Sequence, residues 1–505
     1  MYNNKKILHA LFFILGLSGI APTIIAKDKQ MESGVVAPPA LAQTHFINEL
    51  DSDTSPSTLP DSILSLLKKY KIPANNLSIY VRDINAKQAM LSHNIDEMRA
   101  PASTMKLLTT YAALKILSPS YSWRTEAWTR GELENGILTG DLILKGYGDP
   151  FLVYENYWKF IRSLREKGLK EIQGNVIIDN SYFDTAYFDP AAFDNKPFRT
   201  YNAAPSALMF NFQSTRFLFT PDEAGKKIDV TPYPDIPNFT FNNKIVYNNK
   251  KCRRSHYRPK FSFDDVGTLT IKGKYSLKCG QKFILRSFST AEEHAFNGFR
   301  DFWNELGGTL QGSMQTGRIK PSDKRLHVSA SPTLGEQIRL INKWSNNVMT
   351  RQVLLTIGAR IYGAPATLQK GRDAILSLLA ENNINTNGII IDNGSGLSRK
   401  SRISARQMAQ LLETAYRDPY MPEFMASLSL PGLDGTLVSR FRKGDLRGRS
   451  HLKTGTLNNV TAIAGYMLNR KGKRLVIVIQ HNGKKSGGGR GTKIQNALLR
   501  WSFEQ

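Results

Sequence analysis

Two patterns of apolar residues in the first quarter of the chain predict a strand hairpin followed closely by a helix. Leu77–Asp83 alternates as a strand does, a turn follows, and residues 90–92 supply a second strand. From 107 to 114 apolar residues recur with a helical period, and Pro101 suits the first turn of this helix, where its missing N–H is not needed. A further helix is expected before the hairpin, over 59–67. This order favours a sheet packed against the helix that begins near Pro101.

The span from about 119 to 325 has a different character, because helical periodicity is sparse and turn residues separate short apolar or alternating runs. The runs that most resemble strands lie at 140–144, 174–179, 216–219 and 268–271. They predict one or two β-rich domains inserted after the helix. The Gly-Tyr-Gly-Asp-Pro segment at 146–150 is interpreted as a turn, because it lacks the third glycine of a dinucleotide loop.

Helical patterns return in the last third of the chain. Thr333 and Glu336 have the spacing of a capping box, which predicts a helix start. A strand is expected at 388–392, and two further strand patterns, at 461–468 and 474–479, precede a final helix. These last elements can complete the sheet begun by the hairpin. We therefore expect an α+β fold, with an antiparallel sheet flanked by helices.

Residues 1–26 have the pattern of a secretory signal peptide. Two adjacent lysines form a charged n-region, an apolar stretch follows over 7–20, and Ala26 offers a small residue before a cut. The stretch is too short and too broken by glycine and proline to favour a stable membrane span, with an uncleaved anchor as the alternative. Residues 27–57 are polar and are interpreted as a flexible linker. The mature protein is thus expected in the periplasm.

The chain has 505 residues, enough for two or three domains, and a formal net charge of +26. This excess implies an anionic partner or environment. The basic residues are dispersed, and their densest cluster, at 250–254, is short and has no nucleic-acid motif. We therefore expect no nucleic acid partner, and an anionic cell wall or membrane surface fits the charge.

Two cysteines, Cys252 and Cys279, are present in this exported chain. Such a pair can form one disulfide, and two free thiols are the alternative. The eight histidines are scattered, and no His-x-x-x-His or Cys-x-x-Cys pair occurs. We expect no metal site and no cofactor.

The candidate chemistry begins with Ser103 and Lys106, which lie three residues apart near the start of a helix and are therefore neighbours on one face. A serine hydroxyl is a weak nucleophile until a base takes its proton, and lysine can do so only if burial or nearby cations lower its pKa. The spacing alone is a weak signal, because 65–68 and 450–453 fit the same Ser-x-x-Lys pattern. On its own it is more often a solvated helix surface.

Two further motifs follow in the chain, and the set resembles that of penicillin-binding proteins and β-lactamases. Ser345-Asn346-Asn347 lies on the helix expected after Thr333, and Lys453-Thr454-Gly455 precedes the last strands. Ser-x-x-Lys, Ser-x-Asn and Lys-Thr-Gly in this order form the motif set of those serine enzymes. Ser-x-Asn also occurs at 92–94, so the rarer Lys-Thr-Gly carries most of the weight.

The resemblance implies a role for each residue. Ser103 attacks a carbonyl, neutral Lys106 takes its proton, and Ser345 relays that proton to the leaving amine. Asn347 presents an amide to the substrate and to Lys106. Lys453 holds positive charge that lowers the pKa of Lys106 and attracts a substrate carboxylate.

The Lys-Thr-Gly segment supplies the remaining groups. The hydroxyls of Thr454 and Thr456 can bind the same carboxylate, and the backbone N–H groups of Ser103 and Thr456 would form an oxyanion hole. Taken singly, Asn347 would be a helix-surface amide and Lys453 an edge-strand lysine that prevents aggregation.

The wider chain resembles the class C low-molecular-mass penicillin-binding proteins, which are D-alanyl-D-alanine carboxypeptidase/endopeptidases. The segments most specific to that family lie at 80–83, 99–103, 146–150, 393–397 and 431–437. The resemblance implies a transpeptidase-like domain split into 58–118 and 326–505 by inserted β-rich accessory domains over 119–325. Two residues depart from the family pattern: Asn346 stands where Asp is common, and Arg351 where an acid is common.

The resemblance implies a serine DD-peptidase that hydrolyses peptidoglycan stem peptides through an acyl-serine intermediate. β-Lactam antibiotics are then expected as covalent inhibitors. A β-lactamase is the nearest alternative, although the large insertion and the lack of an obvious Glu-x-x-x-Asn loop argue against it. A non-catalytic cell-wall-binding scaffold is the second alternative.

Overall fold

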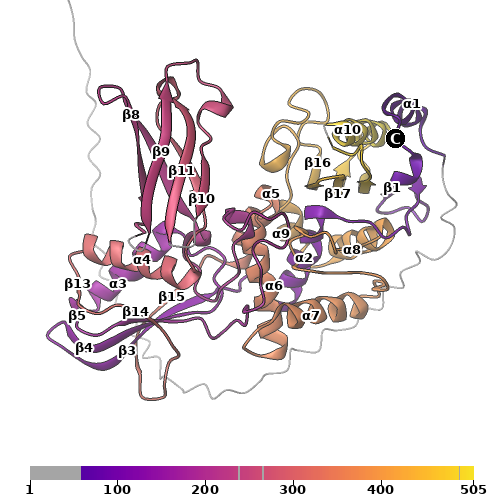
Figure 1. The fold of residues 1–505 in the computed structure, drawn as a ribbon. Helices are drawn as coiled ribbons and strands as arrows, with labels where there is room; N and C mark the ends of the chain where they lie inside the picture. Colours follow the sequence, from indigo (N-terminus) through magenta and orange to yellow (C-terminus); the bar gives the residue numbers. More distant parts are fainter. Residues whose placement is uncertain (1–57, 237–238, 264–266, 488) are drawn as a thin grey trace, which may run out of the picture. The chain divides into compact units, whose positions relative to one another are not determined.

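The computed structural model describes residues 58–236, 239–263, 267–487 and 489–505 (Figure 1). The expected signal peptide, 1–26, and the expected linker, 27–57, lie outside the described residues. No helix in these four ranges is long and apolar enough to cross a membrane.

A five-stranded antiparallel sheet joins the two ends of the described chain. Its strands, in spatial order, are β16 (Ser450–Leu457), β17 (Val460–Leu468), β18 (Arg474–Asn482), β1 (Leu77–Asp83) and β2 (Leu91–His93). The central pairing sets Leu77 of β1 opposite His481 of β18. The last strands thus complete the sheet begun by the hairpin, which confirms the expected fold class.

Helices cover both faces of this sheet, as Figure 1 shows. Alternation along β1 sends Ile79 and Val81 into the core beneath α1 (Asp61–Tyr70) and α10 (Arg490–Glu504), while Tyr80 joins the core on the opposite face. Six helices contribute to that second core. They are α2 (Lys106–Leu117), α5 (Leu334–Trp344), α6 (Asn347–Tyr362), α7 (Leu368–Glu381), α8 (Ala405–Arg417) and α9 (Met421–Ala426). Because both faces are covered, every residue of β1 is buried.

The inserted region contains a seven-stranded mixed sheet with two helices on one face. Its strands are β3 (Arg124–Glu134), β4 (Ile137–Gly146), β5 (Glu171–Ile172), β6 (Val176–Asp179), β13 (Thr309–Leu310), β14 (Met314–Thr316) and β15 (Lys324–Ala330). The helices α3 (Tyr154–Glu166) and α4 (Ala291–Glu305) bury an aromatic core against it, with Tyr157, Phe299 and Trp303 fully buried.

Two three-stranded sheets lie within the same insertion and share a separate core. One consists of β7 (Thr215–Asp222), β8 (Lys227–Tyr233) and β12 (Lys282–Arg286), and the other of β9 (Thr240–Asn248), β10 (Lys260–Phe263) and β11 (Thr268–Ser276). Phe217 and Phe219 of β7 pack with Leu269 and Ile271 of β11 between them. The sulfur atoms of Cys252 and Cys279 are bonded at 2.08 Å, so the disulfide alternative holds.

Short 3₁₀ turns connect several elements. They are η1 (Ala74–Asn76), η2 (Ala102–Met105), η3 (Thr200–Asn202), η4 (Phe210–Gln213), η5 (Arg254–His256), η6 (Leu277–Cys279) and η7 (Gly435–Leu437).

Two expectations differ from the structure. The strand expected at 388–392 is absent, and in that segment only Ile390 forms a bridge, to Arg402. Gly388, its first residue, has a φ of +75°, and Gly394, two residues after its end, has a φ of +68°, so the extended conformation is interrupted at both ends. The expected boundary at 325/326 falls inside β15, because Lys324–Ala330 pairs with β3. That pairing partner is about 200 residues away, and local periodicity carries no sign of it.

Candidate active site

Ser103 and Lys106 lie at the junction of a 3₁₀ turn and a buried helix. Ser103 is inside η2, and Lys106 is the first residue of α2. The preceding Ala102 has a φ of +49°, a conformation that costs a non-glycine residue free energy and recurs at functional sites. Lys106 Nζ lies 3.1 Å from Ser103 Oγ, and the Lys106 side chain is 0% exposed.

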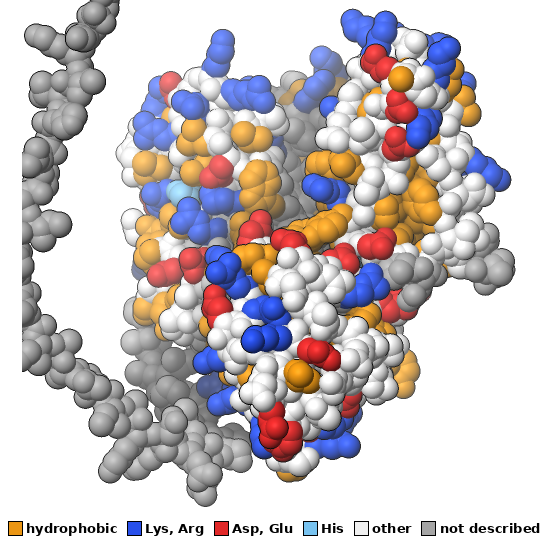
Figure 2. Space-filling view, turned by 90° about the vertical axis from the view of Figure 1, so that its left-hand side faces the viewer, with side chains coloured by type: hydrophobic (Ala, Val, Ile, Leu, Met, Phe, Trp, Pro, Cys, Tyr) orange, Lys and Arg blue, Asp and Glu red, His pale blue; other side chains and the backbone are white. Residues whose placement is uncertain are grey.

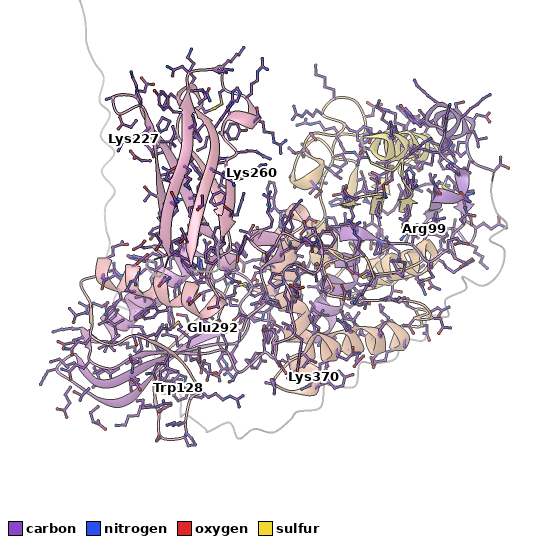
Figure 3. The ribbon with its side chains drawn as sticks, viewed as in Figure 1. Arg99, Trp128, Lys227, Lys260, Glu292 and Lys370 are labelled. Atoms are coloured by element: carbon purple, nitrogen blue, oxygen red, sulfur yellow. A yellow bond between two sulfur atoms is a disulfide. The ribbon has the colours of Figure 1, made fainter. Side chains whose placement is uncertain are left out.

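The segment that leads into this turn is fixed to the central sheet. The Ala100 backbone N–H donates to Asn482 Oδ1 at 2.8 Å, at the end of β18. The guanidinium of Arg99, which is labelled in Figure 3, donates to Ser78 Oγ on β1 at 2.6 Å. Two neighbouring strands therefore set where the Ser103 turn begins.

Lys106 has two further oxygen neighbours besides the serine. Its Nζ lies 2.6 Å from Asn347 Oδ1 and 2.6 Å from the Ser395 carbonyl oxygen. A neutral amine has two N–H donors and one lone pair, and these two oxygens only accept hydrogen bonds. When Lys106 is neutral, they occupy its two N–H groups, and its lone pair is left for the Ser103 hydroxyl.

The surroundings of Lys106 favour this neutral form. Burial lowers the pKa of Lys106 well below its ordinary value, and the positive charges of Lys453 and Arg351 lower it further. The same group is thus both oriented toward the serine and made available as a base.

The loop that supplies the Ser395 carbonyl is held by its own side chains. Asn393 Oδ1 accepts hydrogen bonds from the Ser395 N–H at 3.1 Å and from Ser395 Oγ at 2.8 Å. Gly396, with a φ of +73°, packs against the Ser103 turn so closely that a Cβ there would lie 1.8 Å from the Ala102 carbonyl oxygen. The sequence indicated this loop only as a segment typical of the family, and its contact with Lys106 was not predicted.

Ser345 and Asn347 do not share one helix, which corrects the expectation. Ser345 ends α5 in the left-handed conformation with φ of 58°, and α6 begins at Asn347. Asn346 makes the break, because its side chain accepts a hydrogen bond from the Met349 N–H at 3.1 Å and caps α6. The break lets the two outer residues of the motif reach different lysines.

Ser345 contacts the lysine of the third motif. Lys453 lies on β16, is 0% exposed, and donates from Nζ to Ser345 Oγ at 2.9 Å. Burial lowers the pKa of Lys453 to about 7. Its ammonium form is therefore only partly populated near neutral pH, and a bound carboxylate would favour it.

The rest of the β16 motif lies along the edge of the sheet. Gly455 packs on the serine turn, since a Cβ there would lie 2.9 Å from the Ser103 backbone nitrogen. Thr454 Oγ1 donates to Thr436 Oγ1 at 2.8 Å, a partner that sequence reasoning did not single out. Thr456 is exposed on the same strand. The edge strand therefore lies directly beside the candidate nucleophile.

Arg351, the departure from the family pattern, is buried on α6 one turn after Asn347. Its Nη1 donates to the Ala203 carbonyl oxygen at 3.0 Å, and its guanidinium lies 5.0 Å from the centre of the Phe188 ring. Burial lowers the pKa of Arg351 to about 10. Arg351 also lines a cavity of about 300 Å³ beside the loop of Asn393. The inserted region is thus bonded to the helix that carries Asn347.

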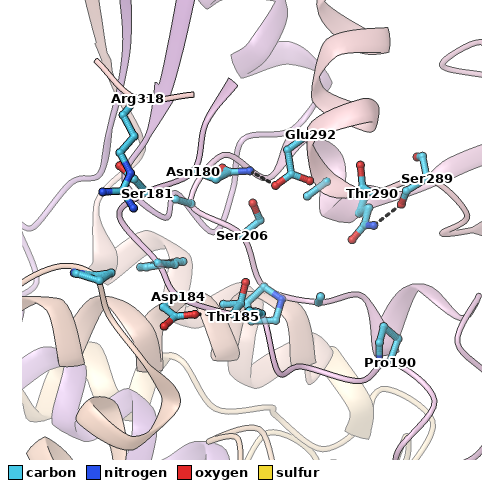
Figure 4. A pocket seen from close by; sticks show the side chains of 18 of the residues that line it. Asn180, Ser181, Asp184, Thr185, Pro190, Ser206, Ser289, Thr290, Glu292 and Arg318 are labelled. Carbon is cyan, nitrogen blue, oxygen red and sulfur yellow. Dashed lines mark hydrogen bonds between the residues drawn. The ribbon is translucent and has the colours of Figure 1, made fainter. Parts of the chain in front are cut away.

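A larger cavity lies elsewhere in the described structure and contains none of the expected site residues (Figure 4). Its volume is about 740 Å³, and Asn180 donates to Glu292 across its lining at 2.6 Å. Its lining residue Ser206 donates from its backbone N–H to Gln352 of α6 at 3.1 Å. Within the described ranges, no cluster of histidine, cysteine and acidic residues is able to hold a metal ion.

The chain is similar in sequence to known D-alanyl-D-alanine carboxypeptidases. The model of the D-Ala-D-Ala carboxypeptidase 3 (S13) family matches residues 59–505. The D-alanyl-D-alanine carboxypeptidase DacB of Haemophilus influenzae is 23% identical over 423 residues, 83% of this chain and 88% of that protein. The D-alanyl-D-alanine carboxypeptidase of Actinomadura sp. strain R39 is 27% identical over 449 residues, 84% of this chain and 81% of that one.

A solved structure shares the fold. Penicillin binding protein 4 (dacB) from Haemophilus influenzae superposes with a TM-score of 0.75 at 21% identity, covering 88% of this chain and 100% of that one. The same protein complexed with a β-lactam gives a TM-score of 0.72 at 21% identity, covering 88% of this chain and 100% of that one. The arrangement of sheets and helices is thus one that is already known.

Proposed function

The chain belongs to the D-Ala-D-Ala carboxypeptidase 3 (S13) family of serine peptidases, and we propose that Ser103 performs its chemistry through an acyl-enzyme that water hydrolyses. The substrates are peptidoglycan stem peptides, cleaved at a terminal D-Ala-D-Ala bond, at a D-Ala–diamino-acid cross-link, or at both. The observation that carries the proposal is the pairing of both Lys106 N–H groups by Asn347 and Ser395, which leaves the lone pair for the serine.

In the acylation step Ser103 Oγ forms a bond to the D-Ala carbonyl carbon as its proton moves to Lys106 Nζ. Ser345, hydrogen-bonded to Lys453, carries a proton to the departing amine, whose C–N bond breaks. In the second step water replaces the amine: its oxygen bonds to the acyl carbon, and Ser103 regains a proton as it leaves. General acid–base transfer of this kind contributes about 10²- to 10⁴-fold to a rate.

The charge that develops on the carbonyl oxygen needs fixed donors. The backbone N–H groups of Ser103 and Thr456 are proposed to supply them, and the close packing of Gly455 on the serine turn supports this. Backbone donors of this type are oriented before the reaction, so they need no reorganisation when the charge appears.

The free carboxylate at the end of the substrate is proposed to bind at β16. Lys453 supplies the cation, and the hydroxyls of Thr454 and Thr456 supply hydrogen bonds. Because a carboxylate would raise the fraction of charged Lys453, binding and catalysis would be coupled through one side chain.

The remaining assignments concern the domains and the compartment. We propose that 58–118 and 331–505 form the catalytic unit, and that the inserted accessory region spans 119–330, because β15 pairs with β3 of the insertion. The sequence pattern of residues 1–26 supports export to the periplasm, where an anionic wall or membrane surface would suit the net charge of +26.

The test is the intact mass of the protein after exposure to penicillin. We expect an adduct of one antibiotic on the wild type and none on Ser103→Ala. A wild type that stays unmodified would contradict the proposal. Product analysis with purified muropeptides then separates carboxypeptidase from endopeptidase activity, and finding no product would favour a non-catalytic scaffold. Rapid release of the adduct from a coloured cephalosporin would favour a β-lactamase.

A further inference from the structure

A pocket of about 650 Å³ lies among residues 195–199, β10 and β12 of the inserted region. Its lining carries five basic side chains: Lys196, Arg199, Arg258, Lys260 and Arg286. None of the residues that line it is acidic. The rings of Phe198, Phe261 and Phe283 form an aromatic part of its wall. The pocket therefore combines concentrated positive charge with apolar surface.

These five cations lack acidic partners in the described structure. None of them has an ion pair with a carboxylate of the described residues. The acid nearest to this lining in the sequence, Asp194, instead accepts hydrogen bonds from Tyr201 and Asn202, each at 2.8 Å. Among the described residues, no carboxylate is thus paired with the positive charge of the pocket.

Arg286 is held in place at the wall of the pocket. Its guanidinium lies 4.5 Å from the centre of the Phe261 ring, and its Nη1 donates to the Leu285 carbonyl oxygen at 2.8 Å. Burial lowers the pKa of Arg286 to about 10, and the charges of Arg199 and Arg258 lower it as well. Keeping a half-buried cation beside two others costs free energy that a bound anion would offset.

A row of lysines continues this positive charge across the neighbouring sheet. Lys260 of β10 lies opposite Lys272 of β11, which lies opposite Lys244 of β9. Like charges directly opposite one another destabilise a sheet, and all three side chains are exposed. Figure 3 labels Lys260 beside these strands, and Figure 2 shows basic side chains more widespread than acidic ones on the face that it displays.

We propose that this pocket binds a multiply charged phosphate ligand, at a site separate from the Ser103 turn. The fork of an arginine guanidinium matches two phosphate oxygens, and three arginines line the pocket. A ligand with several negative charges can neutralise more than one of the five cations. The aromatic wall can at the same time contact an apolar or ring portion of the same ligand.

The test measures binding of sodium tripolyphosphate to the full chain by calorimetry. R258E/K260E reverses two exposed cations of the pocket, and K167E/K170E reverses two exposed lysines outside it with the same change in net charge. We expect the first pair to weaken affinity at least tenfold and the second less than twofold. Equal weakening by both pairs would show diffuse attraction, and no binding by the wild type would also overturn the proposal.

A second variant and a second ligand test whether the pocket itself binds phosphate. Arg286→Met keeps the apolar stem over Phe261 but removes the charge, and it should weaken binding while acylation by a fluorescent penicillin continues. Citrate that binds as tightly as tripolyphosphate would overturn the choice of phosphate over carboxylate.

The source of the phosphate is separated with vesicles. Pocket-dependent binding to vesicles of 30% phosphatidylglycerol in phosphatidylcholine would identify a lipid headgroup as a source. Pocket-dependent binding to tripolyphosphate without vesicle binding would support a soluble or polymer-borne phosphate. Loss of both with R258E/K260E, but not with K167E/K170E, is the result that the proposal expects.

Discussion

Two regions of the molecule differ in the burial and the partners of their basic side chains. In the candidate active site Lys106 and Lys453 are 0% exposed, and each has oxygen partners within 3.1 Å. In the pocket of the inserted region five cations converge without a carboxylate partner in the described structure. Burial with neutral acceptors lowers a lysine pKa and produces a base, whereas partial exposure without a counter-charge preserves cations for an anion.

The largest expected effect is the loss of the base itself. Lys106→Ala removes the group that takes the Ser103 proton, so we expect acylation by penicillin to slow by about 10²- to 10⁴-fold. Lys115→Ala is the matched control, since Lys115 lies on the same helix but pairs with Asp418 at 2.7 Å. Stopped-flow or mass measurement of the acylation rate decides, and equal rates in both variants would remove Lys106 from the mechanism.

Close packing around the serine turn gives the next largest effect. Gly396→Ala would place a Cβ 1.8 Å from the Ala102 carbonyl oxygen and displace the turn that holds Ser103. A shift of about 1 Å in a reacting group can cost about 100-fold in rate, so we expect acylation to fall by 10-fold or more. At Gly487 an added Cβ has nothing within 4 Å. Gly487→Ala should therefore acylate normally, and a normal rate in Gly396→Ala would argue against a rigid turn.

A smaller effect on the acylation rate is expected from substituting Arg351, which is buried near Lys106 as Lys453 is. Its charge lowers the pKa of Lys106, so Arg351→Met should raise that pKa and move the acid limb of the acylation rate to higher pH. We expect a shift of less than about one pH unit, because burial and Lys453 remain as causes. Arg372→Met, in the same cavity, should leave the limb in place. A limb that moves to lower pH would contradict the electrostatic argument.

The smallest effect on catalysis is expected from the disulfide of the inserted region. The bond between Cys252 and Cys279 closes a loop of 27 residues, which corresponds to about 3.5 kcal/mol of stabilisation in the loop-entropy account. The double Cys→Ser variant should therefore lower the unfolding midpoint of the inserted sheets without slowing acylation. Calorimetry of the full chain together with the acylation rate tests this, and a large loss of acylation would show that the two regions are not independent.

Sequence reasoning succeeded where chemistry is local and failed where it depends on distant pairing. Ser103 and Lys106 are three residues apart, and the hairpin and last strands carry clear alternation, so spacing predicted their positions. The Ser395 carbonyl contacts Lys106 through the backbone, and no side-chain motif encodes such a contact. The strand predicted at 388–392 is absent, because glycines with positive φ interrupt the extended conformation there. The boundary predicted at 325/326 crosses β15, and the local pattern carries no sign of the pairing of β15 with β3.

The break at Ser345 shows the same limit within a single motif. A continuous helix through 345–347 satisfied the apolar periodicity, yet the Asn346 side chain starts a new helix there. Asparagine is favoured both at helix caps and in left-handed turns, so the residue types were compatible with either structure. In the structure Ser345 also accepts a hydrogen bond from Lys453, on a strand that is more than 100 residues away, and the local pattern carries no sign of this contact.

The most direct test of the account is the pH dependence of Ser103 acylation by penicillin in the wild-type protein. Acylation needs uncharged Lys106, whose pKa is lowered by burial, Lys453 and Arg351. The rate should therefore rise with pH through a limb well below 10.5, the ordinary lysine value, and loss of the proton from Lys453, whose pKa burial lowers to about 7, should reduce it. A rate that rises only as the pH approaches 10.5 would mean that Lys106 is an ordinary ammonium group, and that result would contradict the account.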